Sequence, residues 1–381
     1  MTVKVGLTEP HGMAAEIALY PAQGVEYTFL ETLRSGSPWL HSPIKGYFST
    51  FDEADVDIIE AILSPIATKK PWFYSLACYQ EALAFDLRGF PIPKTLRNIY
   101  MKQLFNQSNF KGFLFWSKAG QRTVESYGGS QARSLLAKSH VVYPAIRTID
   151  TADKKKRAQR IASQTDEFQL LFSGDFFRKG GVNVIDAFEA LKPRFPGLKL
   201  VVCSSEEIDF NTENKALRAE YLHKLKTTKD IAFGRVDRVD MLYKILPATD
   251  CYLLPSYNEA FGFAVLEAMA YGIPCITTDI MAFPELIDDT KQGYIIDTGK
   301  LDVEKYFRGY VVNDIPAGFR QSVTTQLIAR IESLINNKSL QTQMSQSCFE
   351  RASNDFSFER RNREIKPLYD IAIASSSAQS V

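Results

Sequence analysis

Two carboxylates, Glu259 and Glu267, stand eight residues apart on either side of a Phe-Gly-Phe sequence. The apolar run 250–256 precedes them, and the pattern up to Gly272 is typical of a helix that ends at a glycine. This order predicts a strand, a polar loop and a helix. In parallel α/β sheets such a loop lies beyond the carboxyl end of its strand, where ligands bind. The stretch therefore indicates a site that holds phosphate on backbone amides and sugar hydroxyls on carboxylates.

Each glutamate has a simpler interpretation when it is taken alone. Glu259 could cap the helix or lie in its first turn, and Glu267 could be an ordinary surface residue. Together, and directly after Pro-Ser-Tyr-Asn, they favour the site. Glu259 would then accept hydrogen bonds from a sugar ring and Glu267 from a ribose diol, while loop amides near 261–264 would bind phosphate.

A second motif combines glycines with two cations. Arg178 and Lys179 lie in the sequence from Gly174 to Gly181, between an expected strand and an expected helix. Glycines such as Gly180 let the backbone approach a ligand closely, and cations beside a helix N-terminus suit a diphosphate. The sequence matches neither the dinucleotide fingerprint nor the phosphate loop of nucleotide-hydrolysing enzymes. Taken alone, a strand–turn–helix with solvent-facing cations explains it equally well.

A third motif, Phe233-Gly-Arg-Val236, closes an expected strand at 231–234. Its backbone edge at Gly234, Arg235 and Val236 could contact a nucleobase. A plain strand-to-helix turn is the alternative, and only the order of the three motifs argues against it.

The composition is that of a globular protein with two or three domains. The chain has 381 residues, of which 45% are hydrophobic and 23% charged, and its formal net charge is +1. This balance does not favour nucleic-acid binding. The five cysteines form no CxxC pair, so buried free thiols are expected. No apolar run reaches the roughly 20 residues of a membrane span. We expect a cytoplasmic location, and peripheral contact with the inner face of a membrane stays open.

Strand-like apolar runs alternate with helical patterns, which predicts an α/β fold with parallel sheets. The polar, basic segment 151–167 is expected to link two domains. Its Lys154-Lys-Lys-Arg157 run is interpreted as a solvated linker or helix face rather than a nucleic-acid or lipid patch. The clearest expected helices are 118–127, 182–191, 213–226, 239–245 and 263–271, and the clearest expected strands are 168–173, 198–203, 231–234, 251–254 and 274–277.

In this order the three motifs resemble the C-terminal half of the family 4 retaining glycosyltransferases. The resemblance extends from about 168 to 297 and includes the continuation Glu-Ala-Met-Ala-Tyr-Gly-Ile-Pro from Glu267. It implies the GT-B fold, in which two Rossmann-like domains face each other across a cleft. The implied parts are an acceptor-binding domain (1–150), a linker (151–167) and a nucleotide-sugar-binding domain (168–352). A C-terminal helix that returns to the first domain (353–374) and a disordered tail (375–381) follow.

The resemblance also implies roles for the motif residues. Lys179 and Arg178 would neutralise the donor diphosphate, and Glu259 would hold the donor sugar. Glu267 would bind the ribose. The remaining donor-binding positions would be Gly174, Gly180, Gly234, Arg235, Val236, Phe261, Gly262 and Phe263.

Two departures from the family pattern affect these roles. Many members have an arginine where this chain has Asp175, so Arg178 is a less direct counterpart than Lys179. Many also have a Gly-Gly loop near the first strand that touches donor and acceptor. The corresponding acceptor-side residues here are Pro10, His11 and Gly12, with a single glycine. An aromatic and basic stretch at 72–102 could face a lipid-linked or polysaccharide acceptor, although a core helix with solvated cations is favoured.

The resemblance implies retaining transfer of a sugar from a UDP- or GDP-sugar to an acceptor hydroxyl of a carbohydrate or lipid-linked molecule. Glycan, polysaccharide or glycolipid synthesis is the expected context. No cofactor or metal is expected, because cations and helix dipoles take the leaving-group charge. Asp55-Val-Asp57 is similar to a metal-binding DxD but introduces an apolar strand. The alternatives are a nucleotide-sugar epimerase, a phosphorylase or a non-catalytic nucleotide-sugar-binding subunit.

Overall fold

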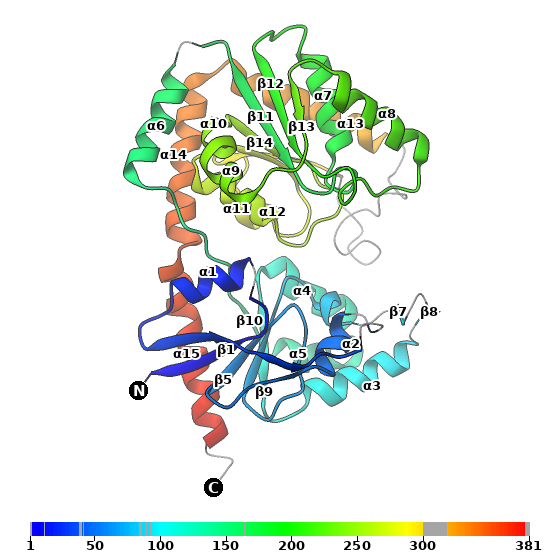
Figure 1. Ribbon diagram of the computed structural model, residues 1–381, viewed down its shortest axis with the longest axis vertical. Coiled ribbons are helices and arrows are strands. Elements are labelled where there is room, and N and C mark those ends of the chain that lie inside the picture. Colours follow the sequence, from blue (N-terminus) through cyan, green and yellow to red (C-terminus); the bar gives the residue numbers. More distant parts are fainter. Residues whose placement is uncertain are drawn as a thin grey trace. The chain divides into compact units, whose positions relative to one another are not determined.

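The computed structural model describes residues 2–10, 12–37, 40, 42–83, 86–87, 90–91, 93–163, 165–299 and 318–377 (Figure 1). The chain divides into two compact units. The first combines Met1–Ala145 with Phe356–Val381, and the second is Ile146–Asp355. The last helix, α15 (Phe358–Ser377), thus belongs to the first unit although it follows the second in sequence.

A parallel sheet of six strands forms the centre of the first unit, in the order β10-β9-β6-β5-β1-β2. The two central strands β5 and β6 are buried along their whole length, which explains why they are apolar except for Glu60 and Ser75. The strands are β1 (Val3–Leu7), β2 (Val25–Phe29), β5 (Ile58–Ile62), β6 (Trp72–Leu76), β9 (Phe110–Phe115) and β10 (Ser139–Val141), with two short antiparallel pairs outside this sheet, β3 (Thr32–Arg34) with β4 (Thr50–Phe51) and β7 (Asp86–Leu87) with β8 (Phe90–Pro91).

Helices and aromatic side chains complete the first unit. Trp72, Tyr74 and Tyr79 are buried in a core that also contains Phe105 and Phe113. The beginning of the aromatic stretch at 72–102 is therefore core, as the favoured interpretation had it, but it forms strand β6 and a 3-10 turn rather than the expected helix. The helices are α1 (Met13–Leu19), α2 (Ser42–Tyr47), α3 (Lys94–Phe105), α4 (Lys118–Tyr127), α5 (Ala132–Leu136) and α15, and single 3-10 turns lie at Tyr79–Ala82 and Gly129–Gln131.

The second unit has its own parallel six-stranded sheet, in the order β13-β12-β11-β14-β15-β16. Numbered along the chain, this is the order 3-2-1-4-5-6 of a doubly wound Rossmann-like sheet. The parallel sheet was predicted from the alternation of strands and helices, and the Rossmann-like domain was implied by the family resemblance. The strands are β11 (Phe168–Ser173), β12 (Leu198–Cys203), β13 (Ile231–Phe233), β14 (Cys251–Leu254), β15 (Cys275–Thr278) and β16 (Gly293–Ile296).

Helices cover both faces of this second sheet (Figure 1). Helix α7 packs against α8 and α13 in one group, and α14 packs against α11 and α6 in the other. Between β13 and β14 the chain forms one π-helical turn, Met241–Ile245, flanked by two short helices. The helices are α6 (Thr151–Ala162), α7 (Gly181–Leu191), α8 (Lys215–Thr227), α9 (Arg238–Asp240), α10 (Leu246–Ala248), α11 (Phe263–Ala270), α12 (Phe283–Leu286), α13 (Phe319–Ile335) and α14 (Lys338–Asp355).

The expected linker at 151–167 differs from the structure, because most of it is helix α6 within the second unit. Asp150 caps this helix by accepting a hydrogen bond from the Asp153 amide at 2.9 Å. Arg157 is buried and donates to the carbonyls of Thr249, Asp250 and Gly272. Burial lowers the pKa of Arg157, and the charge of Asp250 opposes that change. One member of the basic run is therefore a structural anchor rather than part of a surface patch.

Three further expectations can be compared with the described residues. All five cysteines are free and buried, as predicted. The expected tail at 375–381 differs at its beginning, because helix α15 continues to Ser377, and 378–381 lie outside the described residues. Within the described chain, no helix combines the length and the apolar character that spanning a bilayer requires.

Candidate functional site

The order of strands in the second unit reverses between β11 and β14, which pair directly through Leu170–Cys251 and Leu171–Tyr252. In open parallel sheets a crevice forms at such a switch point, beyond the carboxyl ends of the strands, and ligands bind there. The loop after β11 is the Arg-Lys-Gly-Gly motif, and the loop after β14 carries Glu259. The topology therefore brings together the two motifs that lie 80 positions apart in sequence.

The backbone of the cationic loop allows the two loops to pack closely. Gly180 has a φ of +81° and ends the loop as the N-cap of α7. A Cβ atom at this position would overlap the carbonyl oxygen of Pro255, which belongs to the second loop. Gly174 has a φ of +101°, and a Cβ atom there would lie 3.0 Å from Cδ of Lys179. The missing side chain at Gly174 thus makes room for the lysine that the sequence singled out.

Lys179 and Glu259 form an ion pair across the two loops. Nζ of Lys179 lies 3.3 Å from Oε2 of Glu259, and the two side chains are 18% and 12% exposed. Oε1 of Glu259 accepts a hydrogen bond from the Ala260 amide at 3.1 Å. Oε2 is buried, and among the described residues no group donates a hydrogen bond to it, because the lysine is near without hydrogen-bond geometry. A buried acceptor without a donor can take a hydrogen bond from a ligand or a water molecule.

Arg178 lies in the same loop but contacts backbone rather than Glu259. Its Nη1 donates to the carbonyl oxygen of Asn258 at 3.0 Å, and its Nε lies 3.5 Å from Oδ2 of Asp175. The Arg178 carbonyl oxygen in turn accepts a hydrogen bond from the Tyr257 amide at 3.0 Å. Arg178 therefore holds the cationic loop against the residues that lead into Glu259.

Helix α11 begins beside this pair. Gly262 is its N-cap with a φ of +98°, and a Cβ atom there would lie 2.5 Å from Cε1 of Phe283. The rings of Phe261 and Phe263 lie 4.9 Å apart between their centroids. The first amides of a helix have no acceptor within the helix, so this end of α11 is suited to an anion.

Glu267 lies one turn into α11, where Oε1 is 2.6 Å from Nη1 of Arg238. Nearby, the phenol of Tyr252 on β14 is hydrogen-bonded to Ser173 on β11 at 2.8 Å. Burial raises the pKa of Tyr252, and the charges of Glu267 and Glu259 act in the same direction. This phenol therefore stays neutral at physiological pH and contributes no anion to the crevice.

The third motif follows β13. The amide of Gly234, which has a φ of +151°, donates to the carbonyl of Val202 at 3.1 Å and continues the sheet. Arg235 is exposed and Val236 half-buried, so both are accessible to a ligand. The next residues hold the start of α9, because Asp237 accepts a hydrogen bond from the Asp240 amide at 2.8 Å.

Sequence reasoning missed two sets of residues at this site. Arg238, the partner of Glu267, was not singled out. Nor was Asn183 on α7, which is fully buried, accepts a hydrogen bond from the Tyr257 phenol and donates to Thr324 at 3.0 Å. An asparagine in an otherwise apolar helix, two residues after the glycine pair, was the available signal for the second set.

The candidate acceptor-side residues lie in the first unit, after the carboxyl end of β1. Pro10 and Gly12 are exposed, and Gly12, with a φ of +55°, is the N-cap of α1. His11 lies outside the described residues. Of the two DxD aspartates, Asp57 accepts a hydrogen bond from the Lys4 amide at 2.8 Å and so fixes the start of a strand, whereas Asp55 is exposed.

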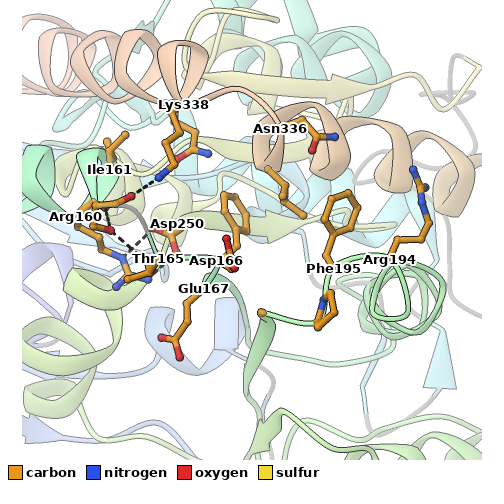
Figure 2. Close-up of a pocket in the computed structure, with 16 residues that line it drawn as sticks. Arg160, Ile161, Thr165, Asp166, Glu167, Arg194, Phe195, Asp250, Asn336 and Lys338 are labelled. Atoms are coloured by element: carbon orange, nitrogen blue, oxygen red, sulfur yellow. Dashed lines mark hydrogen bonds and ion pairs between the residues drawn. The ribbon is translucent and has the colours of Figure 1, made fainter.

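A cavity of about 550 Å³ lies at the opposite end of the second sheet (Figure 2). Phe168 and Asp250, which line it, stand at the amino ends of β11 and β14. Three of its charged groups have partners: Arg160 binds both oxygens of Asp250 at 2.9 and 2.6 Å, and Lys338 donates to the carbonyl of Ser163. This cavity contains none of the motif residues, so it is not the candidate site.

Comparisons with known proteins address the same region. Residues 153–309 match the model of the family described as glycosyl transferases group 1. A capsular polysaccharide biosynthesis glycosyltransferase, CapM of Staphylococcus aureus, is 23% identical over 212 residues, which cover 55% of this chain and 48% of CapM. The N-acetyl-alpha-D-glucosaminyl L-malate synthase of Bacillus anthracis is 42% identical over 60 residues, 16% of each chain. The chain thus spans about half or less of the length of these relatives.

Solved structures resemble the chain over nearly its whole length. A glycosyltransferase from Rickettsia africae has a TM-score of 0.61 at 14% identity, and 98% of this chain and 99% of that chain are covered. HepE of Anabaena, crystallised with UDP and glucose, has a TM-score of 0.59 at 15% identity, with 96% and 98% covered. These likenesses concern the fold, and they agree with two parallel six-stranded sheets. The chain therefore has the GT-B fold, and part of its second unit matches the family of group 1 glycosyltransferases.

Proposed function

We propose that this protein is a retaining glycosyltransferase that transfers a sugar from a nucleotide-diphosphate sugar to an acceptor hydroxyl without a metal ion. The observation that carries the proposal is the pairing of Lys179 with Glu259 at the switch point, where Oε2 of Glu259 is buried without a hydrogen-bond donor. A sugar hydroxyl would supply that donor, and a diphosphate would supply a second anion for the lysine. One donor molecule thus satisfies both groups.

Lys179 is the proposed catalytic cation. As the glycosidic bond breaks, negative charge grows on the departing diphosphate, and a fixed cation stabilises that state more than the bound substrate. Lys179 is largely buried, so its charge is weakly screened by water. Arg178 is the second cation of the loop, and its contact with Asn258 indicates that it also holds the loop that carries Glu259.

Glu259 and Glu267 are proposed to orient the donor rather than to act as acid and base. Glu259 would accept hydrogen bonds from the sugar and Glu267 from the ribose, with the phosphate at the N-terminus of α11 near Phe261, Gly262 and Phe263. Gly174 and Gly180 would let the cationic loop approach the diphosphate, and Gly234, Arg235 and Val236 would contact the base. Attack from the same face, assisted by the leaving phosphate, is the proposed route to retention.

The substrates follow from this class of reaction and from the relatives. HepE was crystallised with UDP and glucose, and CapM takes part in capsular polysaccharide biosynthesis. For this chain we propose a UDP- or GDP-sugar as donor and a carbohydrate or lipid-linked molecule as acceptor. The protein would act on the cytoplasmic side of the cell, and it would contact the inner face of a membrane when the acceptor is a lipid. The acceptor would approach Pro10, His11 and Gly12.

The first experiment identifies the donor nucleotide. A ligand that binds only the folded state raises the melting temperature by mass action, so UDP, GDP and ADP and their sugars are compared by thermal shift. The donor that stabilises the protein is then incubated alone and with candidate acceptors. We expect slow hydrolysis of the donor without acceptor and faster turnover with one. Binding without either reaction would contradict the proposal and favour a non-catalytic subunit, and epimerised donor would identify an epimerase.

The second experiment tests the lysine. Lys179→Met should lower kcat by about 10²- to 10³-fold, the effect of removing one preorganised group that stabilises developing charge. Lys199→Ala is the matched control, since this lysine lies on β12, pairs with Glu167 and is 43% exposed. Near-normal turnover of Lys179→Met, or an equal loss in the control, would contradict the proposed role.

A further inference from the structure

The ion pair between Arg238 and Glu267 points to a role for a residue that no sequence motif contains. We propose that Arg238 is a positioning residue for the donor ribose: it holds the Glu267 carboxylate by one oxygen, Oε1, so that the other, Oε2, faces the ribose hydroxyls. The inference rests on the proposed function, because it takes Glu267 as the ribose-binding residue.

The two charged groups form a close ion pair. Nη1 of Arg238 lies 2.6 Å from Oε1 of Glu267. Glu267 is 23% exposed and Arg238 52%, so the carboxylate is the more protected partner. A planar guanidinium restricts the orientation of the carboxylate that it binds. Less side-chain entropy is then lost when a diol binds to the second oxygen.

The chain places Arg238 for this contact. The Asp237 cap fixes the start of α9 at Arg238, directly after the proposed base-binding residues Gly234, Arg235 and Val236. Glu267 comes from α11, after β14, and two strands of the sheet, β12 and β11, separate β13 from β14. The contact therefore joins segments that follow two strands which are not neighbours in the sheet. The π-helical turn at Met241–Ile245 follows immediately, and such turns often occur at functional sites.

The ion pair between Arg238 and Glu267 also offsets negative charge near the proposed diphosphate. A diphosphate next to two unpaired carboxylates would be repelled by their negative charges. Glu259 is balanced by Lys179, and Glu267 is balanced by Arg238. Each carboxylate can thus accept hydroxyl donors while its charge is offset by a cation from another loop.

The experiment measures the preference for ribose. The nucleoside diphosphate that binds most tightly among UDP, GDP and ADP is titrated calorimetrically, together with its 2′-deoxy analogue. We expect the unaltered protein to prefer the ribonucleotide by about tenfold, the value of one hydrogen bond to a charged group. Arg238→Ala and Arg238→Gln should weaken ribonucleotide binding by about tenfold and reduce the preference below about threefold. Arg238→Lys, which keeps the charge, should restore part of both.

A matched control removes a cation from the same segment. Lys244 pairs with Asp240 at 2.6 Å and is 70% exposed, and Lys244→Ala should leave both affinities unchanged. An unchanged ribose preference in Arg238→Ala, or tighter nucleotide binding by it, would overturn the inference while the proposed function stands. Failure of the unaltered protein to bind any nucleoside diphosphate would instead refute the proposed function, and the inference with it.

Discussion

A buried charge cluster between β5 and α15 predicts how firmly the C-terminal helix is held in the first unit. Glu60 is 1% exposed and Arg361 4%. Nη2 of Arg361 donates to the two oxygens of Glu60 at 3.2 and 3.1 Å, and the phenol of Tyr369 donates to Oε2. Burial lowers the pKa of Arg361, but Glu60, Tyr27 and Tyr369 together outweigh this and the net pKa is raised. Each charge therefore depends on the other.

The substitution Glu60→Gln removes the negative charge and keeps the volume. Removing one partner of a buried pair costs about 3–5 kcal/mol, because the remaining charge stays buried without compensation. Arg361 keeps a hydrogen bond from Nη1 to the Tyr27 phenol at 3.3 Å, so we expect a loss near the lower limit, about 3 kcal/mol. The triple variant Glu60→Leu, Arg361→Met and Tyr369→Phe removes every charge and should lose less than Glu60→Gln alone, because apolar replacement of a buried pair is often neutral.

Tryptophan fluorescence in urea reports the first unit selectively. The three tryptophans are at positions 39, 72 and 116, so none lies in the second unit. With a slope of about 2 kcal/mol per molar urea, a loss of about 3 kcal/mol lowers the midpoint by about 1.5 M. Lys366→Ala is the control: it breaks an exposed pair with Asp370 on the same helix and should cost less than about 1 kcal/mol. A loss below about 1 kcal/mol for Glu60→Gln, or a larger loss in the triple variant, would refute this reasoning.

Three other predictions concern the second unit and the reaction. Gly262→Ala should destabilise the second unit by about 2–4 kcal/mol in thermal unfolding, because φ is +98° at this position and the new Cβ would overlap Phe283. The control Gly299→Ala, with a φ of +77° and open space around the new Cβ, should cost about 1 kcal/mol. Equal losses would contradict the steric argument. Arg157→Met should lower the free energy of unfolding of the second unit by about 3 kcal/mol, because three buried carbonyls lose their donor. The exposed neighbour Lys155 should tolerate alanine. Tolerance at both positions would count against the anchoring role of Arg157. EDTA should leave turnover unchanged, and nuclear magnetic resonance should find the donor's anomeric configuration in the product; a metal requirement or an inverted product would exclude the proposed mechanism.

The elements of the second unit were largely predictable from the sequence. The expected strands at 168–173, 198–203 and 251–254 are strands with the same bounds. Such runs can be recognised because most positions of a parallel strand between helices are buried and apolar, although β11 contains Gln169 and β12 contains Lys199. The expected helix at 239–245 is only partly correct, since a π-helical turn occupies 241–245. Hydrophobic periodicity does not distinguish a π turn from an α-helix, because both present nearly the same face.

The partners of buried polar residues and of the site residues could not be predicted from the sequence. Glu60 and Arg361 are 301 positions apart, and Asn183 and Tyr257 are 74 apart. A single sequence indicates that a polar residue in an apolar element needs a partner, but it does not say which residue supplies it. Glu60, a lone carboxylate in the apolar strand β5, indicated by its position that it needs a buried partner. Arg238 gave no such indication, because an arginine in a polar loop is common.

The loops at the switch point explain how a ligand-free site can keep two charges largely buried. Arg178 and Gly180 bind the cationic loop to Asn258 and Pro255 of the second loop, and these contacts involve backbone. Lys179 and Glu259 are thereby held near each other before any donor arrives, and each offsets the burial of the other. A donor that offers an anion and hydroxyls together can exchange with this pair without leaving either charge unpaired. A free phosphate offers only half of that exchange, so the site is expected to favour the whole nucleotide sugar.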